Sequence, residues 1–152
     1  IWVRSVTNIV EYWHRPEANA SDFRDGWLKT GDIGYLDEDG FLFLADRAKD
    51  MIIRGGENIY PIEIENELLE HEAVKEVAAV GLPDERLGEE VAAVVHLHEG
   101  ASLTEQELIE FARSRLAAYK VPSRVFIWDK ELPRNATNKL LKREIKAALL
   151  EK

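Results

Sequence analysis

The chain has 152 residues, of which 45% are hydrophobic and 32% charged, and its formal net charge is −9. This composition is typical of about one globular domain, large enough to bury a core without cross-links. The absence of cysteine excludes disulfides, thiolate catalysis and thiolate zinc sites, and it fits a reducing cytoplasm.

Acidic residues predominate before residue 113 and basic residues after it. The acidic part disfavours nucleic acid as a partner, whereas the basic tail can attract a phosphorylated small molecule. No apolar run is long enough for a transmembrane segment. The chain begins IWVRSV, with neither an initiator methionine nor a charged and then apolar leader, so we expect a fragment or a processed product and no signal peptide.

Residues 1 to 46 are predicted to form short strands and turns. Two apolar runs, 33–36 and 41–44, flank the polar residues 37–40, which is a hairpin signal. A calcium loop starting at Asp37 would need a glycine at its sixth position and a glutamate at its twelfth. Those positions hold Leu42 and Ala48, so we expect no calcium and assign no metal ligand to the chain.

The segment 46–67, with the sequence DRAKDMIIRGGENIYPIEIENE, combines a short apolar strand, a glycine pair and a helix. Gly55 and Gly56 permit positive φ and a close approach of the backbone, so they indicate either a hairpin turn or a ligand-contact loop. Pro61 suits the first position of a helix whose apolar face carries Ile64 and Leu68.

The remainder is predicted as strand, strand, helix, strand, helix. Strands are expected at 74–81, 91–98 and 125–128, and a capping box at Thr104 starts a helix that runs to about residue 118. Three strands with helices on one side make a small α+β domain. In the last helix, basic residues are expected to form the solvated face, namely Lys142, Arg143 and Lys146.

Generic phosphate-loop, dinucleotide, zinc-protease and serine-hydrolase motifs are absent from the sequence. Polar residues on predicted loops remain as candidates: Asp32, Arg47, Lys49 and Lys139. Taken one at a time, each is typical of a solvated surface.

Three ordered strings change this interpretation: TGD at 30–32, the segment 46–67, and LPRNATNKLLKRE at 132–144. Together they resemble the adenylate-forming enzymes, and GGENIYPIEIE is most similar to the acyl-CoA and aryl-CoA ligase branch. The resemblance implies a synthetase that activates a carboxylic acid with ATP and Mg²⁺ as acyl-AMP and transfers it to coenzyme A. Such an enzyme would belong to fatty or aromatic acid metabolism. In the family, the phosphate loop and the magnesium ligand lie before the part that matches Ile1, so this chain alone is expected to be inactive.

The resemblance also implies a division of the chain. Residues 1–46 would be the β-rich end of a large amino-terminal AMP-binding domain, 47–54 a hinge and first hairpin, and 55–152 a mobile carboxy-terminal domain that works against the large one. The small domain is expected to be α+β, with a three-stranded sheet and flanking helices.

Site roles follow from the same resemblance. Asp32 would bind the ribose hydroxyls of ATP, Arg47 would bridge ribose and phosphate oxygens, and Lys49 would be the hinge residue. Lys139 would contact the acyl carboxylate and phosphate oxygens during adenylation. Asn138 replaces the usual glycine before this lysine, and asparagine tolerates left-handed φ.

The coenzyme A site is expected on other loops. Gly55, Gly56 and Glu57 would line the passage for the pantetheine arm, and Tyr119 and Lys120 would lie near the nucleotide end. Leu87 stands where some relatives have a tryptophan, so stacking on adenine is not predicted.

Two alternatives stay open: a non-catalytic module of this fold that binds a nucleotide, coenzyme A or a protein partner, and an adenylation domain of the peptide-synthetase or luciferase branch.

Overall fold

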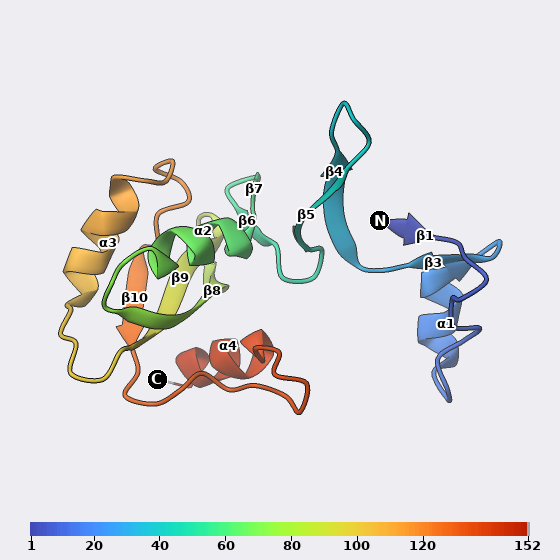
Figure 1. The fold of residues 1–152 in the computed structure, drawn as a ribbon. Helices are drawn as coiled ribbons and strands as arrows, with labels where there is room; N and C mark the ends of the chain where they lie inside the picture. The colour runs from blue at the N-terminus through green and yellow to red at the C-terminus, as the bar shows by residue number, and fades with distance from the viewer. Residues whose placement is uncertain (152) are drawn as a thin grey trace. The chain divides into compact units, whose positions relative to one another are not determined.

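The computed structural model describes residues 1–151. The chain divides into two compact units, Ile1–Lys49 and Asp50–Lys152, shown as a ribbon in Figure 1. None of the helices that the structure describes is long and apolar enough to cross a membrane.

The first unit is built from short β elements and one helix. Strands β1 (Trp2–Val3), β3 (Trp27–Lys29) and β2 (Phe23–Arg24) form an antiparallel sheet in that order, and helix α1 spans Pro16–Asp22. Strands β4 (Asp32–Leu36) and β5 (Leu42–Arg47) form an antiparallel hairpin. The Asp37 carboxylate closes its turn by accepting the N–H groups of Asp39 and Phe41 at 3.0 and 2.8 Å, which confirms the hairpin expected there.

The second unit contains one five-stranded sheet with β9 (Gly88–Leu97) at its centre. β9 pairs antiparallel with β8 (Val74–Asp84), parallel with β10 (Arg124–Ile127), and at Gly88 with β6 (Ile52–Arg54). β6 forms a hairpin with β7 (Glu57–Ile59). The expected α+β domain is therefore present. β6 is the short apolar strand expected before the glycine pair, and the β6–β7 hairpin enlarges the expected three-stranded sheet to five strands.

Helices cover both faces of this sheet. Side chains of α2 (Pro61–Leu69) and α3 (Glu105–Arg113) pack with Val91, Ala93 and Val95 in one buried cluster. Side chains of α4 (Lys142–Leu150, red in Figure 1) pack with Ala92 and Val94 in a second cluster. Since consecutive strand residues point to opposite faces, α4 lies across the sheet from α2 and α3, and the prediction of helices on one side was wrong.

The α3 helix begins as predicted and ends early. The Thr104 side chain accepts the Glu107 N–H while the Glu107 carboxylate accepts the Thr104 N–H, so the capping box is formed. At the other end, the Ser114 hydroxyl donates to the Phe111 carbonyl at 2.7 Å. This side-chain bond replaces a continuing helical bond, and the helix stops at Arg113 rather than near residue 118.

Candidate functional site

Two of the predicted nucleotide-binding residues are neighbours in the first unit. The β4–β5 register places Asp32 opposite Arg47, and the Arg47 Nε donates to Asp32 Oδ1 at 3.1 Å. Their side chains are 30% and 48% exposed. The pair therefore presents a carboxylate and a guanidinium, side by side, to anything that approaches this edge of the hairpin.

A cavity of about 250 Å³ lies beside Arg47 within the first unit. Its walls include the cations Lys29, Arg47 and Lys49, together with Asp22. Thr30 lines it too, and its hydroxyl oxygen accepts the N–H of Asp32 at 3.0 Å. Three cations around one small cavity favour an anionic ligand, and the predicted hinge residue Lys49 belongs to this group.

The glycine pair forms the turn between β6 and β7. Gly55 and Gly56 have φ angles of +58° and +90°, and Arg54 pairs with Glu57 across the turn, as in a two-residue hairpin with both central residues at positive φ. The Gly55 N–H donates to the Leu87 carbonyl at 2.8 Å. The turn interpretation is thus correct, and it leaves a ligand-contact role open.

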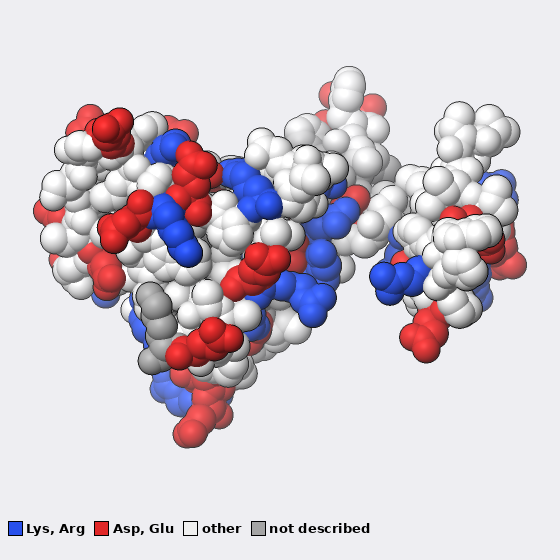
Figure 2. Space-filling model, turned by 90° about the horizontal axis from the view of Figure 1, so that it is seen from below, with Lys and Arg blue, Asp and Glu red and all other residues white. Residues whose placement is uncertain are grey.

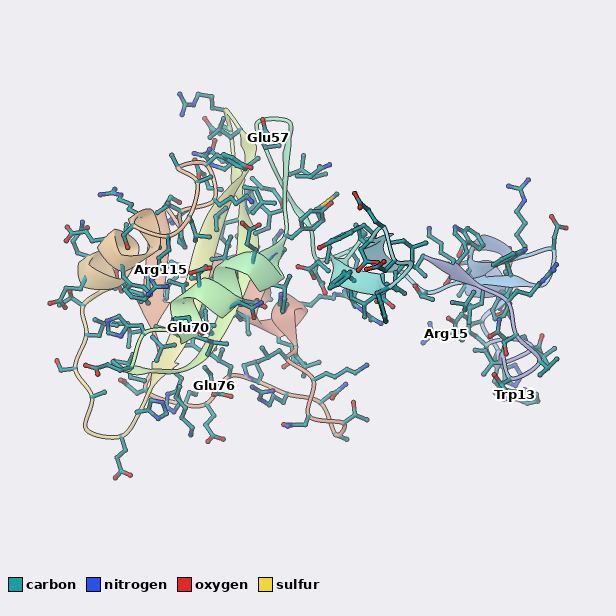
Figure 3. All side chains as sticks on the ribbon, turned by 45° about the horizontal axis from the view of Figure 1, so that its top comes forward. Trp13, Arg15, Glu57, Glu70, Glu76 and Arg115 are labelled. Atoms are coloured by element: carbon teal, nitrogen blue, oxygen red, sulfur yellow. The ribbon has the colours of Figure 1, made fainter. Side chains whose placement is uncertain are left out.

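The two glycines differ in their surroundings. A Cβ on Gly55 would lie 3.1 Å from the Leu87 side chain, whereas a Cβ on Gly56 would meet nothing within 4 Å. Glu57 is exposed next to them and projects from the hairpin in Figure 3. Gly55 therefore faces the 85–87 loop, and Gly56 and Glu57 face open space.

Lys120 is held by a carboxylate of α2. Its ammonium donates to both oxygens of Glu63 at 2.7 and 2.6 Å, and this bond raises the pKa of the Lys120 side chain despite its partial burial. The ammonium also lies 5.5 Å from the centre of the Tyr119 ring. Tyr119 is 37% exposed, so it is a surface aromatic and not part of the core.

Lys139 is presented by a tight turn. Asn138 has φ +63°, the left-handed conformation expected of the residue that replaces glycine. The Asn135 side-chain oxygen accepts the Lys139 N–H, and the Lys139 carbonyl accepts the Asn135 N–H, both at 2.9 Å. The Lys139 side chain is exposed, and its ammonium has no hydrogen-bond or ion-pair partner among residues 1–151.

The basic residues of α4 correct a sequence prediction. Lys142 pairs with Glu65 at 2.7 Å and Lys146 pairs with Glu89 at 2.9 Å, with side chains only 17% and 35% exposed. Arg143 alone of the three is exposed. The solvated-face prediction was wrong for the two lysines because their partners come from α2 and β9, which local sequence does not bring near α4. Figure 2 shows such neighbouring acidic and basic residues on the larger unit.

Sequence reasoning also missed the carboxylate that supports the Lys139 turn. Glu76, labelled in Figure 3, accepts from the Leu132 N–H at 3.0 Å and from two nitrogens of Arg134 at 3.1 and 2.8 Å. The signal was weak: Glu76 is one acidic residue at the start of a strand, and Arg134 belongs to a loop expected to be merely polar.

Comparison with known proteins identifies the family. Residues 63–139 match the sequence profile of the AMP-binding enzyme C-terminal domain. The chain belongs to this family. The match starts at Glu63 in α2 and ends at Lys139, so it contains most of the second unit, including Tyr119, Lys120 and the lysine turn.

Two similar proteins are named as CoA ligases. The chain is 54% identical over 134 residues to a long-chain-fatty-acid–CoA ligase of Bacillus subtilis, covering 88% of this chain and 24% of that protein. It is 56% identical over 135 residues to a 2-succinylbenzoate–CoA ligase of Geobacillus kaustophilus, covering 89% of this chain and 27% of that protein. The chain thus spans about a quarter of the length of these relatives.

The chain is also similar in sequence and fold to solved structures of synthetases. The o-succinylbenzoate CoA synthetase of Bacillus subtilis, in complex with its acyl-adenylate intermediate, matches with a TM-score of 0.86 and 46% identity, covering 95% of this chain and 29% of that one. The amide bond synthetase McbA of Marinactinospora thermotolerans matches with a TM-score of 0.87 and 38% identity, covering 97% and 30%.

Proposed function

We propose that this chain is part of an acid–thiol ligase, an acyl-CoA or aryl-CoA synthetase that uses ATP. A carboxylate oxygen of the acid attacks the α-phosphate of ATP, forming acyl-AMP and releasing pyrophosphate, and the thiol of coenzyme A then takes the acyl group and releases AMP. Relatives named as CoA ligases support the class. The observation that carries the proposal is the fixed turn that presents the exposed ammonium of Lys139, which has no hydrogen-bond or ion-pair partner within residues 1–151.

Three of the charged candidates have a role in the first step. Attack on the α-phosphate concentrates negative charge on phosphate oxygens, and a preorganised cation at those oxygens lowers the barrier. Lys139 supplies that cation, because a point charge on a long stem can arrive for one step and leave for the next. Asp32 accepts from the ribose hydroxyls and Arg47 donates to ribose and phosphate oxygens. Mg²⁺ would neutralise phosphate charge, and we expect its ligands outside this chain.

The domain assignment is supported by two features. The chain divides into compact units between Lys49 and Asp50, next to the proposed hinge residue. The β4–β5 hairpin exposes six large apolar side chains, namely Tyr35, Leu36, Phe41, Leu42, Phe43 and Leu44. Such a surface needs a cover, so residues 1–46 would complete a large amino-terminal domain of the same protein. Residues 47–54 would contain the hinge and the start of the first hairpin, and 55–152 would form the mobile domain.

The coenzyme A step would use the β6–β7 turn. Gly56 has open space where a Cβ would stand, so a pantetheine arm can pass close to the backbone beside Gly55 and Glu57. Lys120 would meet a coenzyme A phosphate beside Tyr119, and the phosphate would have to share the ammonium with Glu63 or displace it. The protein would work in the cytoplasm, where ATP, coenzyme A and fatty or aromatic acids are available.

A second acceptor chemistry is favoured by one comparison. The likeness to an amide bond synthetase makes an amine a candidate in place of the thiol. The adenylation step would be the same, so the two functions differ only in which nucleophile consumes the acyl-AMP.

The test uses the longer protein that contains this chain. Lys139→Ala is expected to abolish acid-dependent ATP–pyrophosphate exchange while leaving thioester formation from supplied acyl-AMP intact. Lys130→Ala, which removes another exposed lysine, is the matched control and should leave both steps unchanged. Equal loss of both steps in Lys139→Ala would contradict the role assigned to this lysine. If the unsubstituted protein transfers the acyl group to amines and not to coenzyme A, the acceptor is an amine and the amide bond synthetase function is the correct one.

A further inference from the structure

The turn that carries Lys139 is tied to the sheet by one arginine. The Arg134 guanidinium donates through Nε and Nη2 to one oxygen of Glu76 at 3.1 and 2.8 Å, and through Nη1 to the carbonyl of Asn138 at 2.9 Å. Asn138 directly precedes Lys139. The Arg134 guanidinium, a rigid fork of donors, therefore connects strand β8 to Asn138, the residue next to Lys139.

The carboxylate on the strand is well placed to hold this fork. The Glu76 side chain is 12% exposed and that of Arg134 is 35% exposed, and the second oxygen of Glu76 accepts the Leu132 N–H at 3.0 Å. Burial disfavours the charged carboxylate, but the bonds from Leu132 and Arg134 outweigh it and lower the pKa of Glu76. The carboxylate is therefore ionised, and its bond to the guanidinium charge-assisted, at neutral pH.

The rest of the turn is held by bonds within itself. Asn135 binds the N–H and the carbonyl of Lys139, and Arg134 pairs with Leu140 as an isolated bridge. Among the hydrogen bonds that the structure describes for residues 133–140, those that reach the sheet run from Arg134 to Glu76. Without Arg134 the turn would lose these bonds to the sheet and the bond to the Asn138 carbonyl next to Lys139, so both its orientation on the domain and the protection of the Lys139 N–H would weaken.

We propose that Arg134 and Glu76 are positioning residues that set where Lys139 points. The proposal rests on the ligase function above and deepens it. A four-carbon side chain reaches a phosphate oxygen productively only if its backbone starts from a fixed place, and a misplacement of about 1 Å can cost about 100-fold in rate. A lysine at 134 would replace the planar fork, whose separate nitrogens bind the two acceptors, by a single ammonium, so it would hold the turn less rigidly.

The structural part is tested on the 152-residue chain by amide hydrogen exchange. Arg134→Ala should accelerate exchange at Leu132 and Lys139 by about tenfold or more, with the core amide of Ala93 unchanged. Arg115→Ala, which removes an arginine paired with Glu67 elsewhere in the unit, is the control and should leave both loop amides as they are. Arg134→Lys keeps the charge and provides a folded variant if the alanine variant is unstable. Unchanged exchange at both amides would show that the bonds from Arg134 to Glu76 and Asn138 do not hold the turn, and would overturn the proposal.

The functional part is tested on the longer protein by separating the two steps. Arg134→Ala and Arg134→Lys should slow adenylation by about 10- to 100-fold and change thioester formation from supplied acyl-AMP by less than about twofold. Accelerated exchange with normal adenylation, or with equal losses in both steps, would overturn the positioning role. If Lys139→Ala itself leaves adenylation intact, the proposed function of Lys139 fails. The exchange data still report separately on whether Arg134 and Glu76 hold the turn, so the two failures can be distinguished.

Discussion

Removal of the buried Glu65 carboxylate should destabilise the second unit more than removal of the more exposed Glu67 carboxylate from the same helix. Glu65 is only 7% exposed. One of its oxygens accepts the buried N–H of Ala79 on β8 at 2.8 Å and binds the Lys142 ammonium of α4 at 2.7 Å. A single carboxylate thus joins α2, a strand of the sheet and the helix on the opposite face.

The magnitude follows from what each substitution leaves behind. Glu65→Ala strands a buried N–H and a lysine with a side chain 17% exposed, and breaking such a pair costs about 3–5 kcal/mol. Glu65→Gln keeps an acceptor for Ala79 and loses only the charge, so we expect about 1–2 kcal/mol. Glu67→Ala breaks a pair with Arg115 in which the side chains are 37% and 41% exposed, which is worth at most about 1 kcal/mol.

Urea unfolding of the chain followed by far-UV circular dichroism measures these differences. Three of the four helices that the structure describes lie in the second unit, so the helical signal reports mainly on it. At roughly 1–3 kcal/mol per molar urea, the midpoint of Glu65→Ala should fall by more than about 1 M. The reasoning is refuted if Glu65→Ala loses no more stability than Glu67→Ala.

Two further predictions concern the Lys139 turn. Asn138→Gly should change stability by less than about 1 kcal/mol because both residues accept a φ of +63°, whereas Asn138→Val should cost about 1–3 kcal/mol; equal midpoints for the two variants would argue against strain at this position. Since the pKa of Glu76 is lowered below its ordinary value of 4.5, its contribution to stability is present above pH 4.5 and is lost as the pH falls through the lowered value. Glu76→Gln should therefore flatten the acid limb of the stability curve, and an unchanged limb would contradict the ion pair.

Much of the second unit could be predicted because its signals are local. The capping box at Thr104 and the positive φ at Gly55 and Gly56 are properties of a few adjacent residues, and the structure contains them. The left-handed Asn138 belongs to the same class. Such features depend on steric preferences that the neighbouring sequence carries in full.

The position of α4 has a signal in the sequence of β9. A sheet covered on one face shows alternating polar and apolar residues, whereas β9 contains the continuous run VAAVV at 91–95, buried throughout. Such a run indicates burial on both faces, so a helix was needed on the far side. The partners of Lys142 and Lys146 had no such signal, because they depend on where α2 and β9 lie in the folded unit.

The central claim is that the Lys139 turn serves adenylation and the turn of Gly55 and Gly56 serves thioester formation. It is tested most directly by measuring ATP–pyrophosphate exchange, and thioester formation from supplied acyl-AMP, for Lys139→Ala and for Gly56→Leu in the longer protein. We predict that Lys139→Ala loses the first activity and keeps the second, and that Gly56→Leu keeps the first and loses most of the second. If both variants lose the same step, or lose both steps equally while folded, the assignment of separate roles to the lysine turn and the glycine turn is contradicted.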